Sequence, residues 1–290
     1  ERAGGKDIEP AADQGLPQLL TPGSGSVDMS EFRLEGRTAL ISGGASGIGL
    51  ACAHWFAKRG CRVGIVDRDE AGALDAARAV GGVAIALDVR KPDAVEIAVQ
   101  NIELQLGGIY TLVNCAGVLQ NPLPPGKLTM KEWDLVTDVD LKGSYLMCAA
   151  VGRRMAERRE GSIVNVASVA GMRSGPLHAY GPAKAAVIAL TECLAAEWGR
   201  QGVRVNAVSP GFTQTPSVAK SIGLGILDGD MLARATALGR LINVEEIAAA
   251  VGFLASPLAS AITGANLPVD AGYLVATPWQ AYGGLRPIGD

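Results

Sequence analysis

The chain has 290 residues, of which 48% are hydrophobic and 19% charged, and its formal net charge is −3. This balance supplies enough apolar residues for one large core and excludes the basic surface that a nucleic-acid partner requires. Because no apolar run is long enough to cross a membrane and the first residues lack the apolar stretch of a signal peptide, we expect a cytoplasmic protein without a membrane partner.

Along the chain, residues 1–34 are rich in Gly, Pro and Ser without a clear period, which predicts an N-terminal tail. From residue 35 onward, short Val- and Ile-rich runs alternate with stretches of helical period. The runs fall at 37–42, 62–67, 82–88, 109–115, 162–167, 203–209 and 266–269. Such alternation predicts an α/β fold, a parallel sheet with helices on both faces, in a single domain over 35–273. A C-terminal extension follows over 274–290.

The first run leads directly into a Gly-rich turn, "SGGASGIG", and then into a helical stretch. Gly43, Gly47 and Gly49 allow the backbone to turn tightly and to approach a pyrophosphate at the start of the helix. The next run ends in Asp67, whose carboxylate suits the ribose hydroxyls of NAD and would repel the 2′-phosphate of NADP. Arg68 is the one neighbouring feature that favours NADP. We therefore predict NAD, with NADP as the alternative.

The stretch "AYGPAKAAVIAL" places two ionisable groups, Tyr180 and Lys184, four residues apart in an otherwise apolar segment. On a helix this spacing stacks the two side chains on one face. A cation beside a phenol favours the phenolate and lowers the phenol pKa, as a general acid/base requires. Because Pro182 is tolerated only near a helix start, we expect the pair in the first turns.

Five motifs in order, "SGGASGIG", "NCAG", "NVASVAG", "YGPAK" and "NAVSPG", resemble those of the classical short-chain dehydrogenases/reductases. The resemblance covers about residues 35–273. It implies a seven-stranded, doubly wound Rossmann sheet and hydride transfer between an alcohol or ketone carbon and nicotinamide. It also implies a homotetramer, or a homodimer, built on two long helices.

By this resemblance, Tyr180 is the general acid/base, Lys184 supplies the cation and binds the nicotinamide ribose, and Ser168 holds the substrate oxygen. The remaining cofactor contacts carry over at lower resolution. For Asn114, bracing of adjacent strands is an equally good interpretation. The implied cofactor-binding residues are Gly43, Ser46, Gly47, Ile48, Gly49, Asp67, Asp88, Val89, Asn114, Ala116, Gly117, Tyr180, Lys184, Pro210, Gly211, Thr213 and Thr215.

One position departs from the resemblance, since "DVDLKG" carries Asp140 where the family often has a catalytic Asn. The Asn is thought to act largely through its main-chain carbonyl, which Asp140 retains. A buried carboxylate would nevertheless pair with Lys184 and weaken its effect on Tyr180. Our hypothesis is that activity is retained with Asp140 as the fourth catalytic residue.

The segment 212–239 occupies the position of the family's substrate loop and is mainly apolar, which argues against a highly charged substrate. We favour a secondary alcohol of the polyol or sugar-like class. Trp279 and Tyr282 in the C-terminal extension are candidates for contact with a neighbouring subunit. The alternatives are an NADP-linked carbonyl reductase and a cofactor-binding regulatory protein with a weakened site. Scattered Cys and His residues predict neither disulfides nor a metal site.

Overall fold

The computed structural model of the chain describes residues 34–286, so the predicted tail lies outside the described residues apart from Leu34. Within that range, strands and helices alternate as the sequence predicts, and the strands pair into one seven-stranded sheet in which neighbouring strands are parallel. The strands are β1 (Thr38–Ser42), β2 (Arg62–Asp67), β3 (Val83–Ala86), β4 (Ile109–Asn114), β5 (Gly161–Val166), β6 (Val203–Pro210) and β7 (Asn266–Val269).

The order of the strands is β3-β2-β1-β4-β5-β6-β7, which confirms the doubly wound prediction. The chain builds outward from β1 to β3, then returns and builds in the other direction from β4. This reversal opens a crevice beyond the carboxyl ends of β1 and β4, where doubly wound sheets bind their ligands. The turns after these two strands are tied together, because Ser42 Oγ accepts the N–H groups of Cys115 and Ala116 at 3.2 and 3.3 Å.

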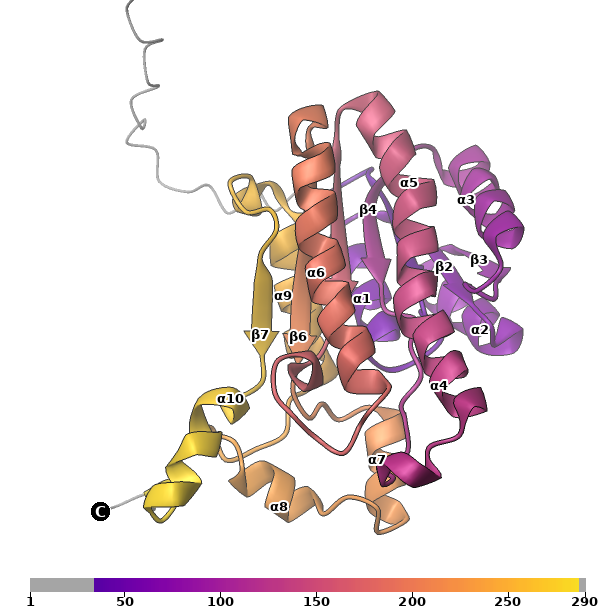
Figure 1. Cartoon of the computed structure of the whole chain (residues 1–290). Helices are drawn as coiled ribbons and strands as arrows, with labels where there is room; N and C mark the ends of the chain where they lie inside the picture. The colour runs from indigo at the N-terminus through magenta and orange to yellow at the C-terminus, as the bar shows by residue number, and fades with distance from the viewer. Residues whose placement is uncertain (1–33, 287–290) are drawn as a thin grey trace, which may run out of the picture. The chain divides into compact units, whose positions relative to one another are not determined.

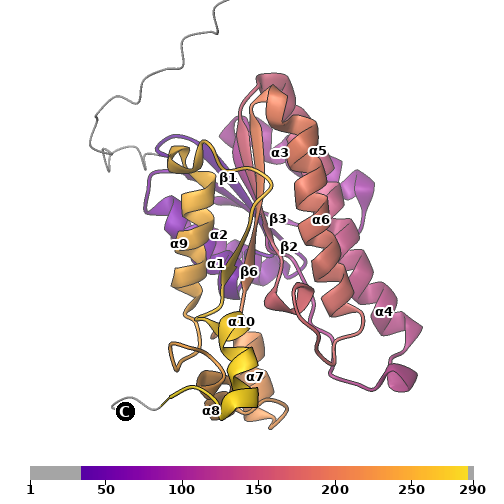
Figure 2. The same cartoon turned by 60° about the vertical axis from the view of Figure 1, so that its left-hand side comes forward.

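Helices cover the sheet on both faces (Figures 1 and 2). One face carries α1 (Gly47–Ala57), α2 (Glu70–Val80) and α9 (Val244–Ala255). The opposite face carries α3 (Pro92–Leu106), α5 (Ser144–Arg158) and α6 (Tyr180–Trp198). Each layer buries its own apolar cluster, centred on side chains such as Phe56 on the first face and Met147 on the second. Burial of one such side chain contributes about 2 kcal/mol, which explains why the strands are apolar on both faces.

The predicted elements are largely confirmed, with two differences. The run predicted over 82–88 forms a shorter strand, β3, because the chain leaves the sheet edge after Ala86. One of the stretches of helical period, residues 130–155, is not a single helix but is divided into α4 (Met130–Val136), a π-helical turn (Thr137–Gly143) and α5. Such π-turns often mark functional positions, and this one carries Asp140.

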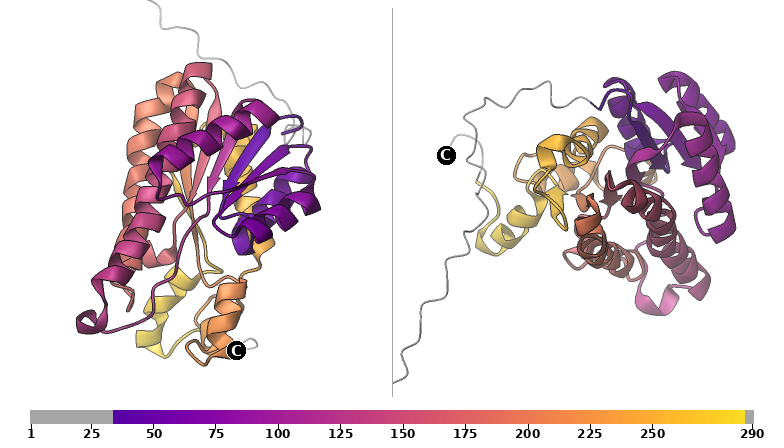
Figure 3. Two further views of the ribbon diagram at one scale, coloured as in Figure 1. Left: turned by 90° about the vertical axis from the view of Figure 1, so that its right-hand side faces the viewer. Right: turned by 90° about the horizontal axis from the view of Figure 1, so that it is seen from above.

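The segments after β6 and β7 lie beyond the carboxyl ends of these strands (Figure 1). The predicted substrate segment contains the helices α7 (Pro216–Gly223) and α8 (Gly229–Arg234). The C-terminal extension begins within α10 (Tyr273–Ala276) and continues as a 3₁₀ turn (Thr277–Tyr282). The left view in Figure 3 shows these orange and yellow segments below the sheet.

Candidate active site

A cleft of about 360 Å³ occupies the crevice at the strand ends. It collects nearly all the residues predicted from the sequence, which come from strand ends, helix starts and the connections between them. The predicted residues that line it are Gly43, Ser46, Gly47, Ile48, Asp67, Asp88, Val89, Ala116, Gly117, Asp140, Ser168, Tyr180, Lys184, Pro210, Gly211, Thr213 and Thr215. The topology therefore assembles one site from residues as far apart as 43 and 215.

The Gly-rich turn wraps from β1 into α1 with two left-handed glycines, Gly43 (φ 68°) and Gly47 (φ 55°). Gly49 does not line the cleft, and a Cβ at this position would overlap the carbonyl oxygen of Gly43. This contact explains the third glycine, since any side chain would push the turn away from the helix. The first residues of α1, Gly47 and Ile48, line the cleft, and the start of a helix there is an arrangement suited to a pyrophosphate.

Asp67 ends β2 at the far wall of the cleft and is fixed by two backbone donors. Its Oδ2 accepts the Ala45 N–H at 3.1 Å and its Oδ1 accepts the Asp69 N–H at 3.0 Å. The carboxylate thus belongs to the Gly-rich turn as well as to β2. Two cations, Arg68 and Arg90, also line this end of the cleft.

Arg90 is already paired, because its guanidinium donates hydrogen bonds of 2.6–3.1 Å to both carboxylate oxygens of Asp88. The hydrogen bonds from Arg90 are the main reason that the pKa of Asp88 falls to about 2, so the carboxylate stays ionised near neutrality. Asp88 lies two residues beyond β3, in the loop that follows that strand rather than at the strand end.

Asn114 ends β4 and is nearly fully buried below the cleft, and it is not among the lining residues. Its Nδ2 donates to Asn165 Oδ1 at 2.9 Å and to Cys148 Sγ at 3.1 Å. Asn165 in turn donates to Thr191 Oγ1 on α6 at 2.9 Å. These contacts brace β4 and β5 against α5 and α6, which supports the strand-bracing interpretation of Asn114.

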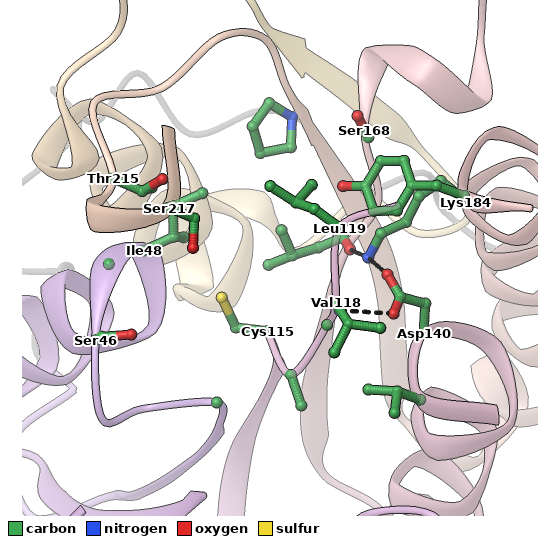
Figure 4. Close-up of a pocket in the computed structure, with 18 of the residues that line it drawn as sticks. Ser46, Ile48, Cys115, Val118, Leu119, Asp140, Ser168, Lys184, Thr215 and Ser217 are labelled. Carbon is green, nitrogen blue, oxygen red and sulfur yellow. Dashed lines mark hydrogen bonds and ion pairs between the residues drawn. The ribbon is translucent and has the colours of Figure 1, made fainter. Parts of the chain in front are cut away.

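The other end of the cleft holds Tyr180 and Lys184 in the first two turns of α6, as Pro182 led us to expect. Lys184 is 4% exposed, and its Nζ lies 5.5 Å from the centre of the Tyr180 ring. The same Nζ donates to the Val166 carbonyl oxygen at 3.0 Å and lies 3.3 Å from Asp140 Oδ2 (Figure 4). The ammonium is therefore held at a fixed point between β5 and the π-turn.

Asp140 is fully buried, and its other oxygen, Oδ1, accepts the Val118 N–H at 2.8 Å. Its main-chain carbonyl accepts the Ser144 hydroxyl at 2.7 Å. Ser168 lies two residues beyond β5 in extended backbone, and its Oγ accepts the Ala170 N–H at 3.1 Å. Figure 4 shows Ser168, Lys184 and Asp140 on the same side of the cleft.

The electrostatics of this cluster confirm the expected pairing of Asp140 with Lys184, but the pKa of Tyr180 is raised rather than lowered. Lys184 and a hydrogen bond with Ser168 do lower the pKa of Tyr180, but burial raises it by more and Asp140 adds to the increase. Burial alone would lower the pKa of Lys184, yet the Asp140 carboxylate and Tyr180 raise it above the ordinary value. The neighbouring carboxylate therefore offsets part of the benefit that Tyr180 draws from Lys184.

Several lining residues escaped sequence reasoning. Val118 and Leu119 follow "NCAG" directly, so their place on the cleft wall follows from chain adjacency. Ser217 and Val218 come from α7, and no motif in the sequence points to them. Across residues 34–286 no helix is long and apolar enough to span a membrane, and no group of three His, Cys, Asp or Glu residues is placed to hold a metal ion.

Comparison with known proteins gives three findings. A family model described as enoyl-(acyl carrier protein) reductase matches residues 43–274. D-threitol dehydrogenase of Mycolicibacterium smegmatis is 40% identical over 86% of this chain and 97% of that protein, and galactitol 2-dehydrogenase of Rhizobium johnstonii is 39% identical over 84% and 97%. A crystal structure titled ribose-5-phosphate isomerase from Brucella melitensis has a TM-score of 0.87 and 56% identity, covering 89% of this chain and all of that one.

The substitution Gly49→Ala tests the Gly-rich turn. Its Cβ would press on the Gly43 carbonyl, so we expect NADH affinity to fall about tenfold, equivalent to about 1.4 kcal/mol. The measurement is a titration of NADH fluorescence, with the far-UV circular dichroism spectrum confirming the fold. Gly223→Ala, a change in open space on α7, is the matched control. Equal affinities in both variants would contradict the prediction.

Proposed function

Because the chain belongs to the short-chain dehydrogenase/reductase family, whose members are NAD(P)-dependent oxidoreductases, we propose that it is an NAD-dependent dehydrogenase of a polyol or sugar-like secondary alcohol. The observation that carries the proposal is the composition of one cleft. It holds a pyrophosphate turn and Asp67 at one end, and Ser168, Tyr180 and Lys184 at the other. A dinucleotide and an alcohol fit this combination together.

The residues of the chain divide the chemistry among them. Bound nicotinamide supplies the acceptor for the hydride that leaves the alcohol carbon. Ser168 holds the substrate oxygen, and the Tyr180 phenolate takes the hydroxyl proton as general base. Lys184 stabilises the phenolate from a fixed position one helical turn away. In the reverse direction, Tyr180 returns the proton to the carbonyl oxygen.

Asp140 has a double role in this proposal. Its carboxylate locks Lys184 in place and links it to the Val118 N–H, while its charge makes Tyr180 less acidic. The ion pair leaves the ammonium protonated, because Asp140 raises the pKa of Lys184. These contacts keep Lys184 charged and in place beside Tyr180, which weighs against a regulatory protein with a disabled site.

The family uses either NAD or NADP, so membership alone does not choose between them. Asp67 favours NAD, since its fixed carboxylate stands at the cleft wall where a 2′-phosphate would enter. Arg90, the stronger candidate for a phosphate partner, is engaged by Asp88, which leaves Arg68 as the feature that supports an NADP-linked reductase.

The relatives support the substrate class, since the names of two of them specify the sugar alcohols threitol and galactitol. The isomerase title of the Brucella structure indicates a different activity. Isomerisation of an aldose phosphate has no use for a pyrophosphate turn beside an acidic strand end, so the cleft favours the dehydrogenase. A homotetramer and a cytoplasmic location stay predictions.

The deciding experiment is an NADH-formation screen of the purified protein over polyols, sugar alcohols and cyclic alcohols. We expect turnover on at least one polyol and a loss of about 100-fold or more in Tyr180→Phe, because the general base is gone. Tyr145→Phe, which removes the same hydroxyl from an exposed position, is the control. Conversion of ribose 5-phosphate without nicotinamide, unchanged in Tyr180→Phe, would instead support the isomerase.

Asp67→Asn tests the choice of cofactor. The amide keeps an oxygen for the Ala45 N–H but removes the charge, so kcat/KM with NADP should rise about tenfold or more relative to NAD. Initial rates with both cofactors measure the ratio. Asp75→Asn on α2 removes a charge that pairs with Arg78 and should leave the ratio unchanged. A native enzyme that already prefers NADP would refute the assignment.

Asp140→Asn tests the role of the buried carboxylate. Oxidation requires deprotonated Tyr180, and Asp140 raises the pKa of Tyr180, so removal of the charge should move the acid limb of the pH–rate profile to lower pH. Asp138→Asn removes an exposed charge from the same π-turn and serves as the control. A limb that stays in place, or moves to higher pH, would show that Asp140 does not influence Tyr180.

A further inference from the structure

The start of α6 has an unusual cap. Its N-cap residue, Ala179, has no side-chain hydrogen bond to offer the first turn, although the first two turns carry Tyr180 and Lys184. The first N–H groups of a helix lack partners within the helix, and burying one of them unpaired is destabilising. Ala179 is fully buried, so its N–H needs a partner from elsewhere in the protein.

That partner is Gln120, fifty-nine residues upstream in the loop after β4. Its Oε1 accepts the Ala179 N–H at 2.7 Å and the Tyr180 N–H at 3.1 Å. The next N–H, on Gly181, donates to the Leu177 carbonyl oxygen at 2.9 Å. One side-chain oxygen therefore accepts two of the donors at the helix start.

The cap is then complete, because Pro182 has no N–H and the first regular helical bond follows from Ala183 to Ala179 at 3.0 Å. Both partners of Gln120 are donors, so the carbonyl end of its amide must face them. The Nε2 end is buried and has no hydrogen-bond partner among the described residues. Burial therefore leaves the amide nitrogen of Gln120 without a hydrogen bond, whereas its amide oxygen binds the start of the helix.

The loop that carries Gln120 is also part of the cleft. Val118 and Leu119 line it (Figure 4), and Asp140 holds the Val118 N–H from the other side. Gly117 packs so closely that a Cβ there would lie 3.1 Å from Asp140 Oδ2 and 3.5 Å from Lys184 Nζ. This short segment consequently contacts the ion pair through Val118 and the base-bearing helix turn through Gln120.

From these contacts we propose that Gln120 is a positioning residue, whose side-chain oxygen fixes the backbone of Tyr180 and so sets the phenol in register with Ser168 and Lys184. The proposal rests on the proposed dehydrogenase function. Gln120 touches neither substrate nor cofactor and acts through the helix start. Displacement of a reacting group by about 1 Å lowers the rate by up to about 100-fold, so fraying of the first turn would lower kcat.

Gln120→Met tests the proposal, because it keeps the length and volume of the side chain and removes the acceptor. We expect kcat for alcohol oxidation to fall roughly tenfold, with NADH affinity unchanged within about twofold. Hydrogen exchange at the amides of Ala179 and Tyr180 should become faster. Gln120→Glu, which restores an acceptor of the same reach, should recover both the rate, at the plateau of its own pH profile, and the protection.

Asn121→Ala is the matched control, since this neighbour is bonded to Glu132 rather than to α6 and should behave like the native protein. A folded Gln120→Met variant with native kcat, unchanged amide exchange, or a Glu variant no better than the Met variant would each overturn the proposal. If Gln120→Met does not fold, Gln120→Asn makes the same comparison with a shorter side chain. A native protein without hydride transfer would refute the proposed function, while amide exchange would still decide whether Gln120 caps α6.

Discussion

The buried ion pair between Lys184 and Asp140 is the interaction around which the site is organised. A buried cation is tolerated only with partners, and Lys184 has two, the Asp140 carboxylate at 3.3 Å and the Val166 carbonyl at 3.0 Å. Satisfying this one ammonium brings together β5, α6 and the π-turn before α5. The carboxylate also fixes the loop after β4 through the Val118 N–H. Four segments that are distant in sequence, namely β5, α6, the π-turn and the loop after β4, are therefore held together by the contacts of one ion pair.

The same pair creates a compromise in the chemistry. A free ammonium would favour the Tyr180 phenolate most strongly, whereas an ammonium neutralised by Asp140 does so less. In exchange, the cation is held rigidly and stays protonated. An enzyme with this arrangement depends more on accurate placement of Tyr180 than on a strongly lowered phenol pKa. That dependence gives the external cap on α6 its importance, since Gln120 holds the backbone from which the phenol projects.

The cofactor end of the cleft follows a different constraint, the close approach of backbone segments. Gly43 leaves so little room that a Cβ there would lie 2.6 Å from the Ala116 nitrogen, and Gly49 lies against the Gly43 carbonyl. Ser42 then joins the turns after β1 and β4 by accepting two N–H groups. A nucleotide site of this kind is formed by backbone geometry, with Asp67 as the side chain that discriminates between cofactors. The catalytic end, by contrast, is formed by side-chain charges.

The sequence by itself determined the alternation of strands and helices, the parallel sheet and the place of Tyr180 and Lys184 in the first turns of a helix, because periodicity, glycine spacing and Pro182 are local signals. Its resemblance to the short-chain dehydrogenases/reductases also implied most cleft residues, and these motifs lie at the carboxyl ends of parallel strands, where the crevice forms. Tertiary structure decided what depends on distant neighbours: the bracing contacts of Asn114, the pairing of Arg90 with Asp88, and the net effect of burial on Tyr180. Gln120 belongs to this second group, because nothing in "NCAGVLQN" reveals that its oxygen meets a helix start fifty-nine residues later.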